Sequence, residues 1–233
     1  MNKHSTFLAV AFDVDETMVS TGGAGARSWM RGFDKLWGVE ADISKYTQGG
    51  MTDPEVGRIT FKGVMGREPE PQELAKIMHA YLGYLPQEVA ESPGYRVLPG
   101  VEGLLLRLIE AGVLVGITSG AVEAATHIKL ARARLNQYFS FGGFGSDSKD
   151  RGELTRTAIG RASIVLGAPL DPAHVRIVGD TPMDIAAAHA AGAIGIGVAT
   201  GKYRIDELQQ AGADHVLSSL TEPFPGLVAP RPS

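Results

Sequence analysis

Apolar runs that alternate with helical patterns constrain the fold of this chain more than any other feature of its sequence. Helical patterns separate these runs from about residue 97 onward, and a further strand is expected at residues 138–141. Strands that alternate with helices of this length predict βαβ units, and therefore a parallel sheet with helices on both faces. The expected fold class is α/β. The runs typical of buried strands are residues 113–118, 175–180, 194–198 and 215–217.

Residues 18–92 interrupt this pattern. Aromatic, leucine and methionine side chains recur there at helical spacing, which predicts amphipathic helices, and no segment of this block indicates a strand. Asp53, followed by proline and glutamate, is typical of a helix start with the aspartate as N-cap. We therefore expect a helical domain over residues 18–92, inserted into an α/β domain that comprises residues 1–17 and 93–233.

Composition excludes several classes of partner. The net charge of -4 over 233 residues gives no electrostatic reason to expect nucleic acid binding. No apolar run approaches the ~18 residues that suggest a membrane span, and the first residues lack the apolar core of a signal peptide. The chain has no cysteine, which excludes disulfides and thiolate metal sites and fits a cytoplasmic protein. Nothing in the sequence indicates the oligomeric state.

Polar residues follow three of the expected strands at the point where each strand ends. Asp13 and Asp15 follow the apolar run of residues 7–12, and alternation along a strand directs both side chains the same way. An isolated Asp-x-Asp is about as often a polar turn as a site. However, Thr118 and Asp180 end two further strands, and carboxyl ends of parallel strands share one edge of a sheet. This convergence favours a ligand site over a turn.

Four aspartates are expected near this edge, namely Asp13, Asp15, Asp180 and Asp184. Mg²⁺ prefers oxygen ligands and typically uses one or two carboxylates together with substrate phosphate. Simpler roles stay open for some of these residues. Thr118 or Ser119 can cap a helix that begins near residue 121, and Asp184 suits the first turn of a helix capped by Thr181.

Three motifs, taken in order, resemble those of the haloacid dehalogenase-like (HAD) hydrolase superfamily. They are Asp13-Val14-Asp15-Glu16-Thr17, Thr118-Ser119-Gly120 and Gly179-Asp180-Thr181-Pro182-Met183-Asp184. The helical block after the first strand resembles the C1-type cap of that superfamily, and the chain is most similar to its phosphoglycolate-phosphatase-like branch. The resemblance extends from residue 7 to about residue 220. It implies a Rossmann-like parallel core with an inserted all-helical cap domain.

The resemblance also implies an enzyme, a Mg²⁺-dependent phosphatase that acts on a small phosphorylated metabolite of the phosphoglycolate or sugar-phosphate type. Asp13 would attack phosphorus to form an aspartyl-phosphate, and Asp15 would act as acid and then base. Mg²⁺ would be held by Asp13, the main-chain carbonyl of Asp15, Asp180 and Asp184. The Thr118 hydroxyl and main-chain N–H groups near Ser119 and Gly120 would bind the phosphoryl oxygens.

The chain departs from the family pattern at two places. The family's cationic residue usually lies in a Lys-Pro stretch that this chain lacks, and the candidates are Arg151 and Lys149. We favour Arg151, because it directly precedes the helix expected to begin near Glu153. Glu16 stands where the family most often has glycine, which places an extra carboxylate near an anionic substrate unless its side chain points outward.

Substrate choice is expected to come from the cap, where the loop that ends in Thr52 and Asp53 occupies the place of substrate contacts in related proteins. For Asp53, helix capping is the stronger alternative. Two other functions stay open. One is a phosphosugar mutase of the same fold, and the other is a weakly active or non-catalytic phosphate-binding protein.

Overall fold

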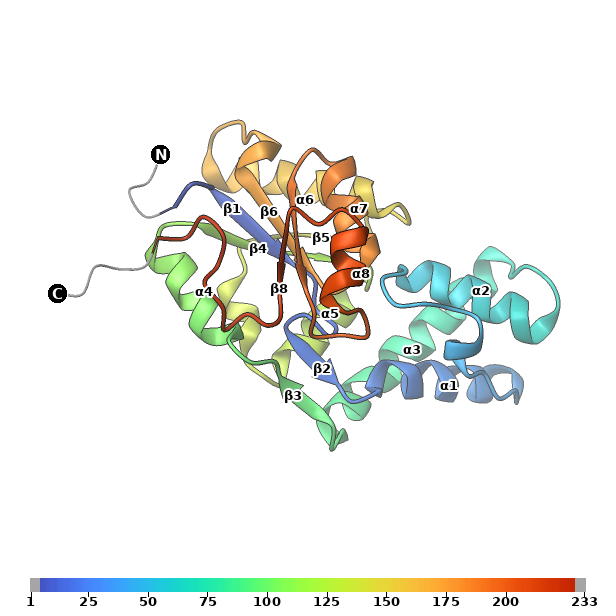
Figure 1. Ribbon diagram of the computed structural model, residues 1–233. Helices are drawn as coiled ribbons and strands as arrows, with labels where there is room; N and C mark the ends of the chain where they lie inside the picture. Colours follow the sequence, from blue (N-terminus) through green and yellow to red (C-terminus); the bar gives the residue numbers. More distant parts are fainter. Residues whose placement is uncertain (1–4, 229–233) are drawn as a thin grey trace.

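A six-stranded parallel sheet forms the centre of the larger lobe of the protein (Figure 1). The computed structural model describes residues 5–228. The strands lie in the order β5-β4-β1-β6-β7-β8, and every neighbouring pair is parallel. The predicted α/β class is therefore confirmed. The strand bounds are β1 Ala9–Phe12, β4 Leu114–Ser119, β5 Phe141–Phe144, β6 Val175–Gly179, β7 Ile194–Val198 and β8 His215–Leu217.

Helices cover both faces of this sheet because its strands are buried on both sides. In β1, Val10 and Phe12 belong to the hydrophobic cluster under α4 and α5, whereas Ala9 and Ala11 belong to the cluster under α6 and α7. This alternation follows from the two-residue period of a strand. The helix bounds are α4 Val101–Glu110, α5 Glu123–Ala131, α6 Arg151–Leu166, α7 Pro182–Ala190 and α8 Ile205–Gln210.

The register of the central strands brings the three motifs to one edge. Phe12, the last residue of β1, pairs with Ile117 of β4 on one side and with Val178 of β6 on the other. The next residues, Asp13 directly after β1 and Thr118 near the end of β4, therefore lie at the same level. This is the crevice at the carboxyl ends of parallel strands where α/β proteins bind their ligands.

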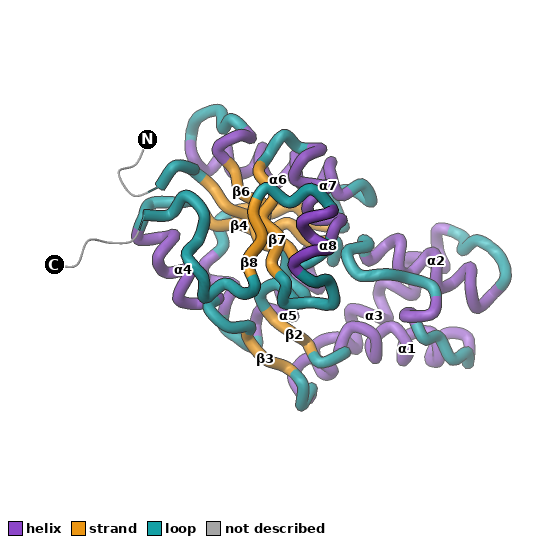
Figure 2. Tube along the Cα trace, in the orientation of Figure 1, coloured by secondary structure: helices purple, strands orange, loops and turns teal. Residues whose placement is uncertain are grey.

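The smaller lobe is a helical cap with its own hydrophobic core (Figure 2). Its elements are α1 Ala24–Trp37, the 3-10 turn η1 Ile43–Lys45, α2 Asp53–Met65 and α3 Pro71–Glu91. Trp29 of α1 stacks on Tyr81 of α3 with ring centroids 4.3 Å apart, and Phe33 and Phe61 are fully buried beside them. The cluster continues into Ala121, Val122 and Ala125 at the start of α5, so the cap packs against the motif that follows β4.

A two-stranded ribbon joins the two lobes. β2 (Val19–Thr21) pairs in antiparallel register with β3 (Tyr95–Val97), so the chain enters and leaves the cap along paired strands. The prediction that residues 18–92 hold no strand is wrong at β2. The reason is physical: three residues carry little periodicity, and their partner strand lies on the far side of the cap in sequence. The domain boundaries at residues 17 and 92 stay a prediction.

The strand expected at residues 138–141 begins later in the chain. It is β5, Phe141–Phe144, and the preceding residues form the 3-10 turn η2 Leu135–Tyr138. The glycines in β5 allow close packing, since a Cβ at Gly143 would lie 2.0 Å from the carbonyl oxygen of Leu154 in α6. Glycine weakens the pattern by which a strand is predicted, which explains the shift.

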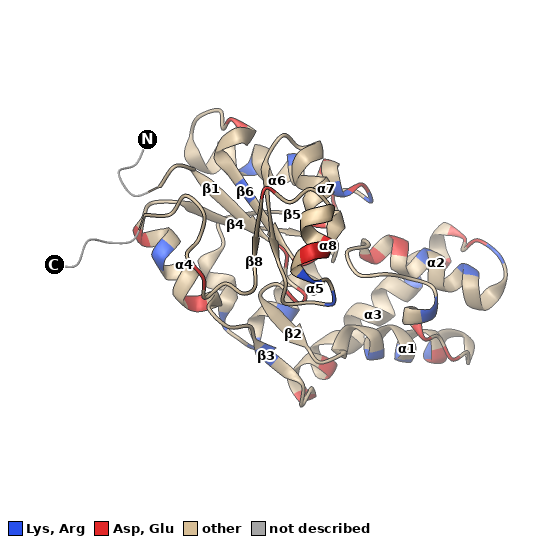
Figure 3. Ribbon diagram, viewed as in Figure 1, with Lys and Arg blue, Asp and Glu red and all other residues tan. Residues whose placement is uncertain are grey.

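Charged residues of both signs are interspersed over the helices of the cap and the core (Figure 3). Within residues 5–228, no helix combines the length and the apolar character that crossing a bilayer requires.

Candidate active site

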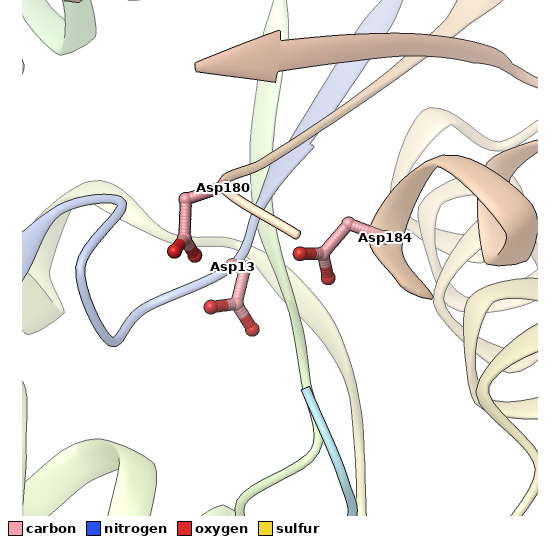
Figure 4. A group of neighbouring side chains, drawn as sticks. All are labelled: Asp13, Asp180 and Asp184. Carbon is pink, nitrogen blue, oxygen red and sulfur yellow. The ribbon is translucent and has the colours of Figure 1, made fainter. Parts of the chain in front are cut away.

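Three aspartates meet at the carboxyl edge of the central strands. Asp13 follows β1, Asp180 follows β6, and Asp184 lies in the first turn of α7, with their carboxylates directed toward a common space (Figure 4). One oxygen from each lies within 4.8 Å of the others. All three side chains are buried, so the cluster is held in a region that water screens poorly.

The start of α7 fixes one of these carboxylates. Thr181 is the N-cap, Pro182 follows it, and Asp184 completes a capping box in which the Thr181 hydroxyl donates to Asp184 Oδ2 at 2.7 Å. The predicted helix start is therefore confirmed, and capping occupies only one oxygen of Asp184. A Cβ at Gly179 would lie 2.2 Å from Asp184 Cγ, so glycine is required where the strand passes this side chain.

Burial and mutual repulsion make these carboxylates hard to ionise together. Burial raises the pKa of Asp13 well above its usual range, repulsion by Asp184 and Asp180 adds to the shift, and attraction to Arg151 opposes it. Burial and the neighbouring Asp184 raise the pKa of Asp180 to about 8. A bound cation would relieve both effects. The all-oxygen donor set suits a divalent cation of the Mg²⁺ kind.

Arg151 supplies a positive charge beside this cluster. Its guanidinium donates to Asp184 Oδ1, and its Nη2 lies 3.6 Å from Asp13 Oδ1. Its Nε and Nη1 atoms are buried and find no hydrogen-bond partner among residues 5–228. Lys149, the other candidate, is exposed. The helix begins at Arg151 itself, two residues before the expected start, because Asp150 caps it by accepting from the Glu153 N–H at 2.9 Å.

The end of β4 brings a hydroxyl to the same place. Thr118 Oγ1 is buried and has no partner within the described part of the chain, so Thr118 does not cap the next helix. Ser119 does not cap it either, because the N-cap of α5 is Val122, and the Ser119 hydroxyl accepts from the Ala121 N–H at 3.2 Å within the preceding turn. A Cβ on Gly120 would lie 3.0 Å from Arg151 Nη1, so this turn passes directly beside the guanidinium.

Asp15 contacts a residue that the sequence reasoning missed. Lys129 of α5 places its ammonium nitrogen 2.5 Å from Asp15 Oδ2. Burial alone would lower the pKa of Lys129, but attraction to Asp15, Tyr81 and Asp53 outweighs it and raises that pKa. A signal existed: Lys129 lies on the buried stripe of α5, together with Ala125, Thr126 and Leu130.

The cap loop closes on this turn through Asp53. The Asp53 N–H donates to the Gly120 carbonyl at 2.8 Å, and the Asp53 carboxylate accepts from the Val122 N–H at 2.9 Å. Burial raises the pKa of Asp53 to about 6. The expectation that Asp53 caps its own helix is wrong. Thr52 is the N-cap residue, and the Asp53 carboxylate instead satisfies the start of α5 across the boundary between cap and core.

Two other residues complete this picture of the predicted positions. Thr52 is 2% exposed, and its hydroxyl has no hydrogen-bond partner in the described chain. Glu16 has a φ of 55°, in the left-handed region that favours glycine. This backbone conformation accounts for the glycine of the family pattern at this position. Its carboxylate accepts from the Ser20 hydroxyl at 2.7 Å, so it is engaged by the ribbon strand β2.

Comparison with known proteins finds similar sequences and the same fold. A family model described as HAD-hydrolase-like matches residues 149–223. A phosphoglycolate phosphatase from Neisseria meningitidis is 27% identical over 94% of this chain and 93% of the relative. The crystal structure of CbbY from Rhodobacter sphaeroides in complex with phosphate has a TM-score of 0.73 and 21% identity, covering 93% of this chain and 96% of the other.

A β-phosphoglucomutase structure from Clostridium difficile has a TM-score of 0.72 and 18% identity, and the alignment covers 92% of each chain. Since the structures are less than 25% identical, they establish the fold alone. The family model and the curated relative show that the chain is similar to HAD-like hydrolases.

Proposed function

We propose that this protein is a Mg²⁺-dependent phosphatase that hydrolyses a small phosphorylated metabolite, of the phosphoglycolate or sugar-phosphate type, through an aspartyl-phosphate intermediate. The chain is an enzyme of the phosphatase class. The metal, the substrate type and the residue roles are the proposal. A cytoplasmic location belongs to it as well, because a chain without cysteine has no disulfide that needs an oxidising compartment.

The observation that carries the proposal is a set of buried donors without partners beside a carboxylate cluster. Thr118 Oγ1 and the Nε and Nη1 atoms of Arg151 find no hydrogen-bond partner among residues 5–228. Leaving a buried donor unpaired costs about 1–3 kcal/mol. Phosphoryl oxygens are acceptors that suit both a hydroxyl and a guanidinium fork. A phosphomonoester bound beside Gly120 would satisfy these atoms.

Asp13 and Asp15 divide the chemistry between them. Asp13 attacks phosphorus as the bond to the leaving oxygen breaks, and Asp15 gives that oxygen its proton. In the second half, Asp15 takes a proton from water as the water oxygen attacks the aspartyl-phosphate. Asp13 lies within the buried cluster, whereas the Asp15 side chain is 44% exposed, which suits a group that exchanges protons with water.

Asp13, Asp180 and Asp184, together with the main-chain carbonyl of Asp15, would hold Mg²⁺. The ion supplies positive charge that lowers the repulsion between a carboxylate nucleophile and a phosphate. Arg151 serves the same electrostatic end from the chain itself, since its side chain lies beside both Asp13 and Asp184. We propose that Arg151 takes the role that a lysine usually has in the family. The exposed position of Lys149 argues against the alternative.

The cap loop is proposed to bind the part of the substrate beyond the phosphate. Its closeness to the core supports this, because a Cβ on Gly120 would lie 2.5 Å from the carbonyl oxygen of Met51. Thr52 follows in the same loop and carries an unpaired buried hydroxyl within the described chain. Asp53 contributes mainly by anchoring the loop, since its carboxylate is already engaged by Val122.

The experiment is hydrolysis of a panel of phosphorylated metabolites, with and without Mg²⁺, by the wild type and Asp13→Asn. We expect hydrolysis that needs Mg²⁺ and falls on the order of 10³-fold or more in Asp13→Asn. Asp34→Asn, at an exposed position of α1, is the matched control and should keep wild-type rates. Hydrolysis that survives Asp13→Asn would contradict the covalent mechanism.

The same panel separates the alternative functions. A phosphosugar mutase remains the second candidate because of the structural likeness to a β-phosphoglucomutase. With a sugar phosphate, a mutase would accumulate a bisphosphorylated sugar in place of released phosphate. Phosphate binding without hydrolysis of any substrate would favour a non-catalytic phosphate-binding protein.

A further inference from the structure

Lys129 is a buried cation that the proposed function leaves without a role. Its side chain is only 6% exposed, although it belongs to a helix whose other face meets solvent. Lysine is almost never buried to this degree unless it is paired, because removing its charge from water is costly. Lys129 is nevertheless buried here, in contact with the Asp15 carboxylate.

The contact with Asp15 restricts how that carboxylate can point. Lys129 Nζ engages Asp15 Oδ2 at 2.5 Å, whereas Oδ1 receives no hydrogen bond from residues 5–228. An ammonium can donate to Oδ2 in both protonation states, since the carbonyl oxygen of a neutral carboxyl is also an acceptor. The other oxygen is then left to carry or receive the proton.

The cap supplies the second set of charges around Lys129. Asp53 of cap helix α2 attracts the Lys129 charge, whereas Tyr81 of α3 stays a neutral phenol because burial raises its pKa. Asp53 is fixed there only while the cap is closed, because its N–H donates to Gly120 and its carboxylate accepts from Val122. Opening the cap would remove a carboxylate from the surroundings of Lys129.

We propose that Lys129 is a positioning residue that holds the Asp15 carboxyl in its proton-transfer orientation. The inference rests on the proposed function, in which Asp15 protonates the leaving oxygen. As the bond between Asp13 and phosphorus forms, the bond to the leaving oxygen breaks, and the proton on Asp15 Oδ1 passes to that oxygen. Lys129 touches neither the substrate nor phosphorus in this step.

The test compares two phosphomonoesters that need the acid to different degrees. Glycerol 2-phosphate releases an alkoxide-like oxygen that must be protonated, whereas p-nitrophenyl phosphate releases a phenolate that needs little help. The measured quantity is kcat/KM, which covers only the steps through release of the alcohol or phenol. The later hydrolysis of the aspartyl-phosphate therefore does not enter the comparison.

In Lys129→Met, we expect kcat/KM for glycerol 2-phosphate to fall on the order of 10²-fold, and that for p-nitrophenyl phosphate to fall less than about 10-fold. Lys129→Arg, which keeps a cation, should recover most of the difference. Lys76→Met, at an exposed position of α3, is the matched control. Equal losses on both substrates, or no loss, would overturn the proposal, since a merely structural role cannot distinguish the leaving groups.

A double-mutant cycle tests whether Lys129 acts through Asp15. In an Asp15→Asn background, adding Lys129→Met should leave the ratio of the two kcat/KM values unchanged. A further fall in the ratio would mean that Lys129 acts by another route. If Lys129→Met does not fold, Lys129→Gln replaces it in the same comparison.

A crystal structure of Lys129→Met gives a readout that needs no substrate. The Asp15 carboxylate should leave its present orientation or become disordered, and an Asp15 side chain that stays in place would overturn the inference. An inactive wild type with a displaced Asp15 in the variant would instead reject the proposed function while supporting the positioning role.

Discussion

Gly201 lies in the loop after β7, where one added methyl group would collide with the aspartate cluster proposed to bind Mg²⁺. A Cβ at this position would lie 1.8 Å from Asp180 Oδ2 and 2.8 Å from Asp180 Cγ. Ordinary contact begins at 3.4 Å, so the oxygen must move by about 1.6 Å. Since φ at Gly201 is not positive, alanine fits the backbone and the collision itself is the perturbation.

The displacement is large for a metal ligand. Catalytic groups must be held within about 0.5 Å of their working geometry, and a misplacement of about 1 Å can cost on the order of 10²-fold in rate. Asp180 is also held from its other side, because the Thr17 hydroxyl donates to Oδ1 at 3.2 Å. Rotation away from the methyl group breaks that bond. We expect Gly201→Ala to raise the Mg²⁺ concentration for half-maximal hydrolysis by about 10–100-fold.

Two measurements check this prediction. Mg²⁺ titrations of hydrolysis give the apparent affinity, and the rise in Tm on adding Mg²⁺ gives binding without turnover. Gly160→Ala is the matched control, because a Cβ there meets nothing within 4 Å and the residue lies in the middle of α6. It should gain up to about 1 kcal/mol of stability with unchanged Mg²⁺ dependence. A Gly201→Ala protein whose apparent Mg²⁺ affinity stays within about 3-fold of the wild type would refute the reasoning.

Three further predictions concern charged residues at the site. The pKa of Asp53 rises from 3.8 to about 6 on folding, so the free energy of unfolding of the wild type falls as pH rises between these two values. Asp53→Asn should therefore be more stable than the wild type at pH 7.5 by on the order of 3 kcal/mol, and equally stable near pH 3. Equal pH profiles of the two proteins in urea denaturation would contradict this. Arg151→Met leaves the carboxylates of Asp13 and Asp184 without their cation, so the free energy of unfolding of the metal-free protein should fall by about 3–5 kcal/mol in urea denaturation, and little hydrolysis should remain. A fall below about 1 kcal/mol would argue against the pairing. Glycine adopts the left-handed backbone of position 16 without strain, and this gain offsets the lost hydrogen bond to Ser20, so Glu16→Gly should change the free energy of unfolding by less than about 1 kcal/mol. We expect kcat/KM to stay unchanged, and a change of about tenfold would show that Glu16 reaches the substrate.

The sequence predicted those parts of the site that follow from strand alternation and helix starts. Asp13 and Asp180 could be placed because each directly ends an apolar run, and parallel strands bring such ends together. Asp184 could be placed because Thr181-Pro182 marks a helix start. These signals are local in the sequence, and the parallel pairing of the strands then brings the residues close together.

The contacts that were missed are those between distant segments. Lys129 in α5 donates to Asp15, which follows β1, and Asp53 of the cap accepts from the Val122 N–H of the core. The local pattern predicted a helix cap for Asp53, and no pattern singled out Lys129. Only the buried position of Lys129 among apolar neighbours signalled otherwise. The ribbon strand β2 was missed for the same reason, because its partner lies beyond the whole cap.

The antiparallel pairing of β2 with β3 brings together the two points where the chain enters and leaves the cap. Thr21 at the end of β2 lies opposite Tyr95 at the start of β3, and a Cβ on Gly22 would lie 2.6 Å from the backbone of Gly94. A two-residue Asn-Gly turn, the connection that suits a tight hairpin, can therefore join the strands in place of the whole insertion. Exchanging the insert at this junction would leave the register of the central strands untouched, so the lobe proposed to select the substrate can be replaced by any insert that also covers Ala125 and satisfies the Val122 N–H.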